Sequence, residues 1–378
     1  MLLNYEYTLW DETTIYFKEV FQPIEKLKRV NELSLFGFQV DIQNDVTLQK
    51  VSEKLKSLSS LRTFTAYFPC ADWISLRGMR HFSNALSQMK QLSKLSLHFE
   101  NCPSLDDQCL HALFKTLKKQ KNLQSLELDF RTCRMITGKG LKDLTSTLKR
   151  MQFLKELCLG VANQTHKNTP DLLAPGLTHL ISLNKLKIDF TDLYVSQDTD
   201  FSSLWTSSAH LNSLRVLSLD FSSTAHRSPP LKNLSTNLKS LIHLHTLSLS
   251  FRFCSIDSGL ETDLLVQCLQ SIPSLNNLTL DFSHFENMDG HILKQLSLCL
   301  GALTNLSEVS LLFNGCQGLG DADVEILVCE LGRLPNLHSV KLNFVGCEPI
   351  KSTHYEALKV NKNIKNLTFD YQKCEFSK

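Results

Sequence analysis

The sequence of 378 residues predicts an α/β solenoid, a curved array of about twelve strand–helix repeats of ~31 residues with a parallel sheet on its concave face. Three observations predict this fold class. An apolar pattern that ends in phenylalanine recurs at a nearly constant spacing, the residues within it alternate as in a β-strand, and a second apolar set upstream has the spacing of a helix. Stacked units of this kind bury one continuous core.

The repeating pattern reads apolar-x-x-apolar-x-apolar-x-Phe, as in Leu92, Leu95, Leu97 and Phe99. Its first residue recurs every 27 to 31 residues, at Val30, Leu61, Leu92, Leu123, Leu154, Leu183, Leu214, Leu244, Leu275, Leu306, Leu337 and Ile364. We therefore expect residues 30–378 to form one repeat array. Residues 1–29 are expected to form an N-terminal helical cap, because Phe17, Val20, Ile24 and Leu27 have helical spacing.

Within each repeat, the sequence predicts a short strand, a turn and a helix. The fourth, sixth and eighth positions alternate with polar residues, so their side chains should point into the core. Upstream of each strand the apolar spacing is 3, 4 and 3, as in Leu141, Leu144, Leu148 and Met151 before Leu154. That spacing places one helix face on the core. The intervening segment 133–140 contains the glycine and threonine that turns and helix N-caps favour.

These repeats resemble the ribonuclease-inhibitor-like class of leucine-rich repeats, whose units read L-x-x-L-x-L-x-x-N/C-x-(L/C) and continue through a turn into a helix. The resemblance covers residues ~17 to 374. The phenylalanine that closes each 31-residue unit is also similar in style to the expanded leucine-rich-repeat sets of ciliated protists. The resemblance implies a protein that binds other proteins on its concave sheet.

Two features depart from that class. The position that usually holds the Asn/Cys ladder carries Glu100, Arg131 and Val345, whereas a cysteine recurs two residues later, at Cys102, Cys133, Cys254, Cys316, Cys347 and Cys374. We expect these cysteines to act as small buried apolar residues. The eighth position forms a phenylalanine series, Phe68, Phe99, Phe130, Phe190, Phe221, Phe251, Phe282, Phe313 and Phe344, which Tyr371 closes. Alternation predicts that these rings stack in the core.

Composition excludes several classes of partner. A formal net charge of +2 lacks the basic excess that nucleic-acid binding requires, and no run of 18 apolar residues predicts a membrane span. Residues 1–12 contain no signal-peptide pattern. The twelve cysteines are therefore interpreted as free thiols of a cytoplasmic, reducing environment.

The chain carries none of the common catalytic motifs. It has no G-x-S-x-G elbow, no H-E-x-x-H pair, no phosphate-binding loop with lysine and no C-x-x-C pair, so we predict no enzyme activity, no cofactor and no metal. An enzyme-regulating role is the alternative, because one ribonuclease-inhibitor-like family activates a small GTPase. That family ends in a long acidic tail, whereas residues 371–378 do not form one.

The third, fifth and seventh positions of each unit should face outward on the concave sheet. They hold nine acidic residues, Glu32, Glu127, Asp129, Glu156, Asp189, Asp220, Asp281, Glu308 and Asp370, against four lysines, Lys94, Lys185, Lys187 and Lys341. The sequence thus predicts an acidic face that binds a partner protein with a basic surface, in which Glu127, Asp129, Glu156, Asp189, Asp220, Asp281 and Asp370 contribute. The alternative is that these polar side chains only solvate the sheet.

Three irregular segments, 161–175, 191–208 and 222–230, interrupt the regular units. The second contains Tyr194 and Trp205, which we predict to contact the partner, because loops that interrupt a regular repeat often determine specificity. Tolerated surface insertions are the alternative. The partner is expected to be a protein, in which case the chain acts as a scaffold or as a subunit of a larger assembly.

Overall fold

The computed structural model describes residues 31–35, 45–68, 70–161, 169–193, 201–208, 210–224, 238, 240–254, 259–272 and 274–371. The predicted helical cap, residues 1–29, lies outside these ranges. The chain forms two compact units, which divide between Leu186 and Lys187.

The described strands are β1 (Glu32–Leu35), β2 (Thr63–Tyr67), β3 (Lys94–His98), β4 (Ser125–Asp129), β5 (Glu156–Gly160), β6 (Lys185–Asp189), β7 (Val216–Asp220), β8 (Thr246–Ser250), β9 (Asn277–Asp281), β10 (Glu308–Leu312), β11 (Ser339–Asn343) and β12 (Asn366–Asp370). The described helices are α2 (Asp45–Leu55), α3 (Leu76–Gln88), α4 (Asp107–Leu117), α5 (Gly138–Leu148), α6 (Thr169–Leu177), α7 (Ser202–Ser208), α9 (Gly259–Gln270), α10 (Gly290–Ala302), α11 (Asp321–Gly332) and α12 (Thr353–Val360).

The sheet is parallel, and within each unit the strands follow in chain order. Strands β1 to β5 pair in this way in the first unit, and β7 to β12 do so in the second. The repeat length sets the register: Leu95 lies beside Leu126, and Leu126 lies beside Leu157. Equivalent residues therefore form apolar columns, and these three leucines are buried.

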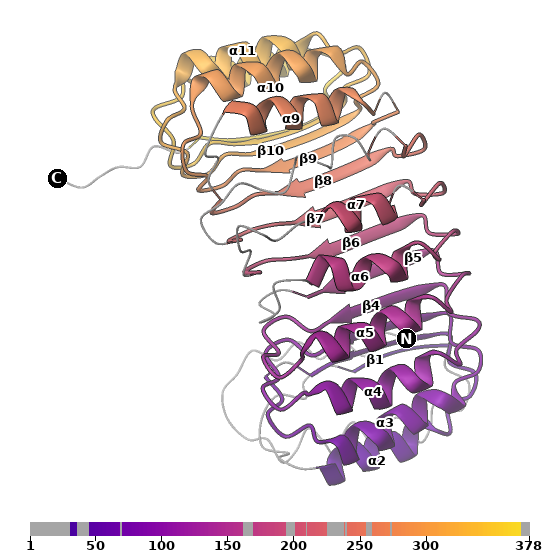
Figure 1. Ribbon diagram of the computed structural model, residues 1–378. Coiled ribbons are helices and arrows are strands. Elements are labelled where there is room, and N and C mark those ends of the chain that lie inside the picture. The colour runs from indigo at the N-terminus through magenta and orange to yellow at the C-terminus, as the bar shows by residue number, and fades with distance from the viewer. Residues whose placement is uncertain are drawn as a thin grey trace, which may run out of the picture. The chain divides into compact units, whose positions relative to one another are not determined.

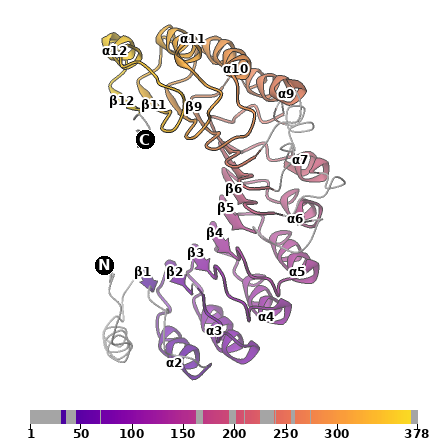
Figure 2. The same cartoon turned by 90° about the vertical axis from the view of Figure 1, so that its left-hand side faces the viewer.

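Within each unit the helices cover one face of the sheet and leave the other face open (Figure 1, Figure 2). The predicted inner helix positions Leu141, Leu144 and Leu148 are buried in α5. Thr137 caps this helix by accepting a hydrogen bond from the backbone N–H of Lys139. The predicted fold class, an α/β leucine-rich-repeat solenoid with a parallel sheet, is thereby confirmed. We call the helix-free side of the sheet the open face.

Neighbouring repeats are also joined where their helices begin. The carboxylate of Asp107, at the start of α4, accepts hydrogen bonds from the backbone N–H of Thr137 (2.8 Å), its hydroxyl (2.5 Å) and the N–H of Gly140 (3.0 Å). A Cβ on Gly140 would lie 2.6 Å from Oδ1 of Asp107, so only glycine allows this approach. One carboxylate thus satisfies the first amides of the helix in the next repeat.

The phenylalanine series forms the predicted buried stack. Ring centroids are 5.0 Å apart between Phe68 and Phe99 and 5.9 Å between Phe99 and Phe130 in the first unit. In the second unit the separations lie between 5.3 and 5.9 Å, through Phe190, Phe221, Phe251, Phe282, Phe313 and Phe344. In the fifth repeat Val161, which is also buried, takes this position.

The recurring cysteines do more than fill space. In the five that the structure describes, Sγ donates a hydrogen bond to the carbonyl of the phenylalanine in the preceding repeat, at 2.9 to 3.1 Å, in the pairs Cys102–Phe68, Cys133–Phe99, Cys254–Phe221, Cys316–Phe282 and Cys347–Phe313. The sixth, Cys374, lies outside the described residues. Burial raises the pKa of the Cys316 thiol to about 11, which keeps it protonated and able to donate. The expectation of purely apolar cysteines is therefore incomplete. A thiol ladder satisfies turn carbonyls in place of the asparagine ladder.

Candidate functional site

In each unit the strand positions on the open face hold more acidic than lysine side chains. In the first unit it holds Glu32, Glu127, Asp129 and Glu156 against Lys94 and Lys185, and in the second it holds Asp189, Asp220, Asp281, Glu308 and Asp370 against Lys187 and Lys341. Most of these side chains are partly or fully exposed. Acidic groups on a shared face add their fields, and two of these carboxylates have a cation nearby, Asp129 with Arg131 and Asp281 with Arg252.

In the first unit, β2 to β4 bring four polar residues into one cluster. The Tyr67 and His98 rings stack with centroids 4.1 Å apart, and the Ser96 hydroxyl lies 2.8 Å from Nε2 of His98 and 2.7 Å from Oε2 of Glu127. Ser96 has a single proton and donates it to the carboxylate, so His98 donates to Ser96 from Nε2. Burial and then the charge of Glu127 raise the pKa of Tyr67.

Asp129 adjoins this cluster and is held by Arg131. The guanidinium donates to both carboxylate oxygens, from Nε at 2.9 and 3.1 Å and from Nη2 at 2.7 Å, and the backbone N–H of Arg131 donates at 3.0 Å. Asp129 is 8% exposed. Burial raises the pKa of its carboxyl, but the nearby His98 ring and the hydrogen bonds from Arg131 outweigh that effect, so the pKa lies well below its usual range.

The order serine, histidine, aspartate in this cluster does not produce an activated nucleophile. His98 would have to accept the Ser96 proton at Nε2, but that proton is directed to Glu127. In addition, Nδ1 of His98 lies 3.8 Å from Oδ2 of Asp129, beyond hydrogen-bond distance. The arrangement is a hydrogen-bonded polar cluster on the open face.

In the second unit, the predicted aspartates stabilise the ends of their strands. Oδ1 of Asp189, Asp220 and Asp281 accepts the backbone N–H two residues later at 2.9 Å, from Thr191, Ser222 and Ser283. These turns explain in structural terms why aspartate recurs at the seventh position. They also fix each carboxylate in one orientation at the edge of the open face.

An exposed aromatic group next to these aspartates was missed by the sequence analysis. Phe253 is 53% exposed, its ring stacks on His284 with centroids 4.7 Å apart, and the Arg252 guanidinium lies 5.7 Å from the ring centroid. Phe253 adopts a left-handed φ of 55°, which is strained for a bulky residue. Its position, the tenth of the repeat, lies beyond the strand columns, and the other described repeats place smaller or polar residues there, namely Cys70, Asn101, Thr132, Asp192, Ser223, His284, Gly315 and Gly346.

The structure corrects one predicted contact residue. Trp205 is 2% exposed and packs in the core of its repeat, with its ring 5.9 Å from Phe201 and 6.2 Å from Phe221. It belongs to the amphipathic helix α7, so its side chain fills the interior and cannot contact a partner. Tyr194 lies outside the described residues, as do parts of all three irregular segments.

The remaining predicted residues lie on the open face. Glu156 accepts a hydrogen bond from the Ser125 hydroxyl at 3.0 Å, and exposed Asp370 lies 3.5 Å from Nδ2 of Asn343. Among the described residues, no group of three His, Cys, Asp or Glu side chains is arranged to hold a metal ion. The helices in the described ranges are all too short or too polar to cross a membrane.

Comparison with known proteins identifies the fold and no family. No family model matches the chain, and no curated protein matches it. A chain in the crystal structure of the yeast Rad7–Elc1 complex is similar, with 18% identity, a TM-score of 0.51, and coverage of 81% of this chain and 68% of that chain. At this identity the similarity shows the fold alone.

Two further solved structures are more distant. Internalin C2 from Listeria monocytogenes has 22% identity and a TM-score of 0.38 over 69% of this chain and 92% of that chain. A chain of the TLR13–ssRNA13 complex has 15% identity and a TM-score of 0.39 over 85% of this chain and 44% of that chain.

Proposed function

We propose that this protein is a non-catalytic interaction module that binds the basic surface of a partner protein through the open face of its sheet and the adjacent turns. One observation carries the proposal: the carboxylates of Asp189, Asp220 and Asp281 share one column position and are each oriented by a backbone hydrogen bond. Pre-oriented charges cost little entropy when a partner binds, and their combined field speeds encounter.

Phe253 supplies the anchor that the strand columns lack. Aromatic and arginine side chains dominate many interfaces, and here an exposed ring lies between Arg252 and His284. Nε of Arg252 also lies 3.8 Å from Oδ2 of Asp281, which connects the aromatic group to the acidic column. The proposed interface of the second unit therefore combines an apolar anchor with oriented negative charge.

The proposal also includes the class of the repeats, the cellular compartment and the kind of partner. The helices described between successive strands support the ribonuclease-inhibitor-like class, and the closing phenylalanine supports a similarity to ciliate repeat proteins. The eleven cysteines among the described residues are not joined in disulfides, which favours a reducing, cytoplasmic compartment. The acidic open face favours a basic protein over nucleic acid as partner, within a larger assembly.

The acidic column is tested by replacing Asp189, Asp220 and Asp281 together with asparagine. Asparagine keeps the Oδ1 acceptor that each turn needs and removes the charge, so the fold should persist. With the partner first captured from native lysate, identified and purified, we expect association to slow roughly threefold to tenfold at about 50 mM salt, and much less at about 300 mM.

The matched control removes three charges from the helix side of the same unit, in the variant Asp263→Asn, Glu325→Gln and Glu356→Gln. All three residues are exposed and lie on α9, α11 and α12. This variant should bind at the wild-type rate. Equal association rates for the column variant and the wild type, with both folded, would remove the acidic face from the proposal.

A further inference from the structure

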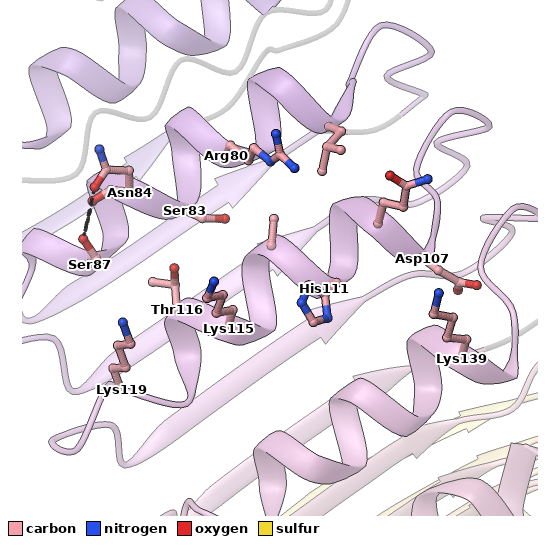
Figure 3. Close-up of a pocket in the computed structure, with 13 residues that line it drawn as sticks. Arg80, Ser83, Asn84, Ser87, Asp107, His111, Lys115, Thr116, Lys119 and Lys139 are labelled. Atoms are coloured by element: carbon pink, nitrogen blue, oxygen red, sulfur yellow. Dashed lines mark hydrogen bonds between the residues drawn. The ribbon is translucent and has the colours of Figure 1, made fainter.

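A groove on the helix side of the first unit lies between α3 and α4 (Figure 3). It has a volume of about 790 Å³, within the range of sites that hold ligands or short peptide segments. Small side chains line its floor, from Ser83, Asn84 and Ser87 on α3 and Ala112 and Thr116 on α4. These short side chains leave open the space between the two helices.

The rim of the groove is positively charged. Arg80, Lys115, Lys119 and Lys139 line it, and among the described residues none of these four makes an ion pair. The acidic lining residue, Asp107, already accepts three hydrogen bonds from the start of α5. His111 is engaged by Asp143 at 2.8 Å. The side chains that line the groove therefore carry a net positive charge.

Ser83 is a second, independent observation that points to a polar ligand in the groove. Its side chain is 3% exposed, lines the groove on the side of α3 that faces α4, and its Oγ has no hydrogen-bond partner (Figure 3). An unsatisfied buried hydroxyl is costly, so such groups are rare in native structures. A polar group that enters the groove would satisfy it.

At the equivalent positions of other repeats, the buried hydroxyl has a hydrogen-bond partner. Ser52 in α2 and Ser297 in α10 occupy the same place, nine residues before the strand pattern, and each donates to the carbonyl four residues earlier. Thr145 in α5 donates to the carbonyl of Leu172. Only Ser83 of these four hydroxyls points its oxygen into a groove without a partner.

We propose that this groove binds an acidic segment of a partner protein, with carboxylates on the cationic rim and one polar group on Ser83. The two helices that form the groove have 13 and 11 residues, so an extended segment can lie along them and meet Lys115 in α4 and Lys119 just after its end. The site lies on the helix side, so it does not depend on the proposed role of the open face.

The probe for this site is a fluorescein-labelled peptide of alternating aspartate and serine, about ten residues long, titrated with the full chain. We expect saturable binding that weakens as salt rises. The double variant Lys115→Glu, Lys119→Glu should bind roughly tenfold more weakly or worse. A control with the same charge change, Lys294→Glu with Lys365→Glu, alters exposed lysines of the second unit and should bind as the wild type does.

Ser83→Ala separates recognition from charge alone. Removing an unsatisfied hydroxyl should leave resistance to urea equal or higher, yet weaken peptide binding roughly threefold to tenfold. A folded Ser83→Ala variant with unchanged affinity would overturn the role of Ser83. Two results would overturn the groove as an acidic-peptide site. One is an equal loss of binding in the groove variant and in the lysine control variant, and the other is tighter binding of an oligothymidine of the same length than of the peptide.

Discussion

Replacing Phe130 with alanine is expected to lower the free energy of unfolding by about 3–5 kcal/mol. The ring is 1% exposed, stacks on Phe99 and meets Phe114 edge-on with centroids 6.2 Å apart. Truncation leaves a cavity between repeats that the neighbours cannot close, because Phe99 is held in the stack by Phe68 and the neighbour on the other side, Val161, is a smaller side chain. Urea unfolding followed by circular dichroism measures the loss.

Phe153→Ala is the matched control for this prediction. Phe153 is 71% exposed in the turn before β5, so its truncation should change the stability by less than about 0.5 kcal/mol. If Phe130→Ala also costs less than about 1 kcal/mol, the phenylalanine stack does not hold neighbouring repeats together.

Replacing Asp129 with alanine is expected to lower the free energy of unfolding by about 2–4 kcal/mol. The substitution leaves the Arg131 guanidinium without its bidentate partner and the backbone N–H of Arg131 without an acceptor. The Arg131 side chain is 33% exposed, and solvent therefore reduces the penalty below that of a fully buried pair. Urea unfolding at neutral pH measures this difference between the variant and the wild type.

The same pair predicts a pH dependence. The carboxyl of Asp129 has a pKa below the ordinary value of 3.8 in the folded chain, so the folded state binds the proton less readily than the unfolded chain does. The contribution of the Asp129 carboxylate to the free energy of unfolding is complete above pH 3.8 and is lost as the pH falls below that value. The stability gap between wild type and Asp129→Ala should therefore narrow at acidic pH. A gap that stays constant from neutral pH to about pH 2 would contradict the charge-based explanation.

The repeat length and the two periodicities made the fold predictable from the sequence. Residues such as Leu95, Leu126 and Leu157 repeat at the period that the sheet register uses, so strand positions, burial and the phenylalanine stack follow from counting. The acidic open face is predictable for the same reason, because alternation separates outward from inward positions.

Other features depend on geometry that spacing does not contain. Trp205 lies in an irregular segment, and only the formation of α7 decides that its ring faces Phe201 and Phe221. The carboxylates of Asp220 and Asp281 accept the backbone N–H two residues later. These hydrogen bonds depend on the conformation of the turn, which the alternation of strand positions does not contain. Ser83 and Ser52 occupy equivalent positions in the sequence. The structure distinguishes them, because the Ser52 hydroxyl donates to the carbonyl of Leu48 and the Ser83 hydroxyl has no hydrogen-bond partner.

The most direct test of the account removes one complete repeat, residues 110–140, and measures circular dichroism and urea unfolding. The deletion joins Cys109 to Leu141, which occupies the position of the buried Leu110, so the apolar columns stay in register. Since contacts in a solenoid connect nearest neighbours, the shortened chain should keep an α/β spectrum and unfold cooperatively, whereas deletion of residues 110–124 alone should not. A random-coil spectrum for the complete-repeat deletion would contradict the solenoid on which every proposal here depends.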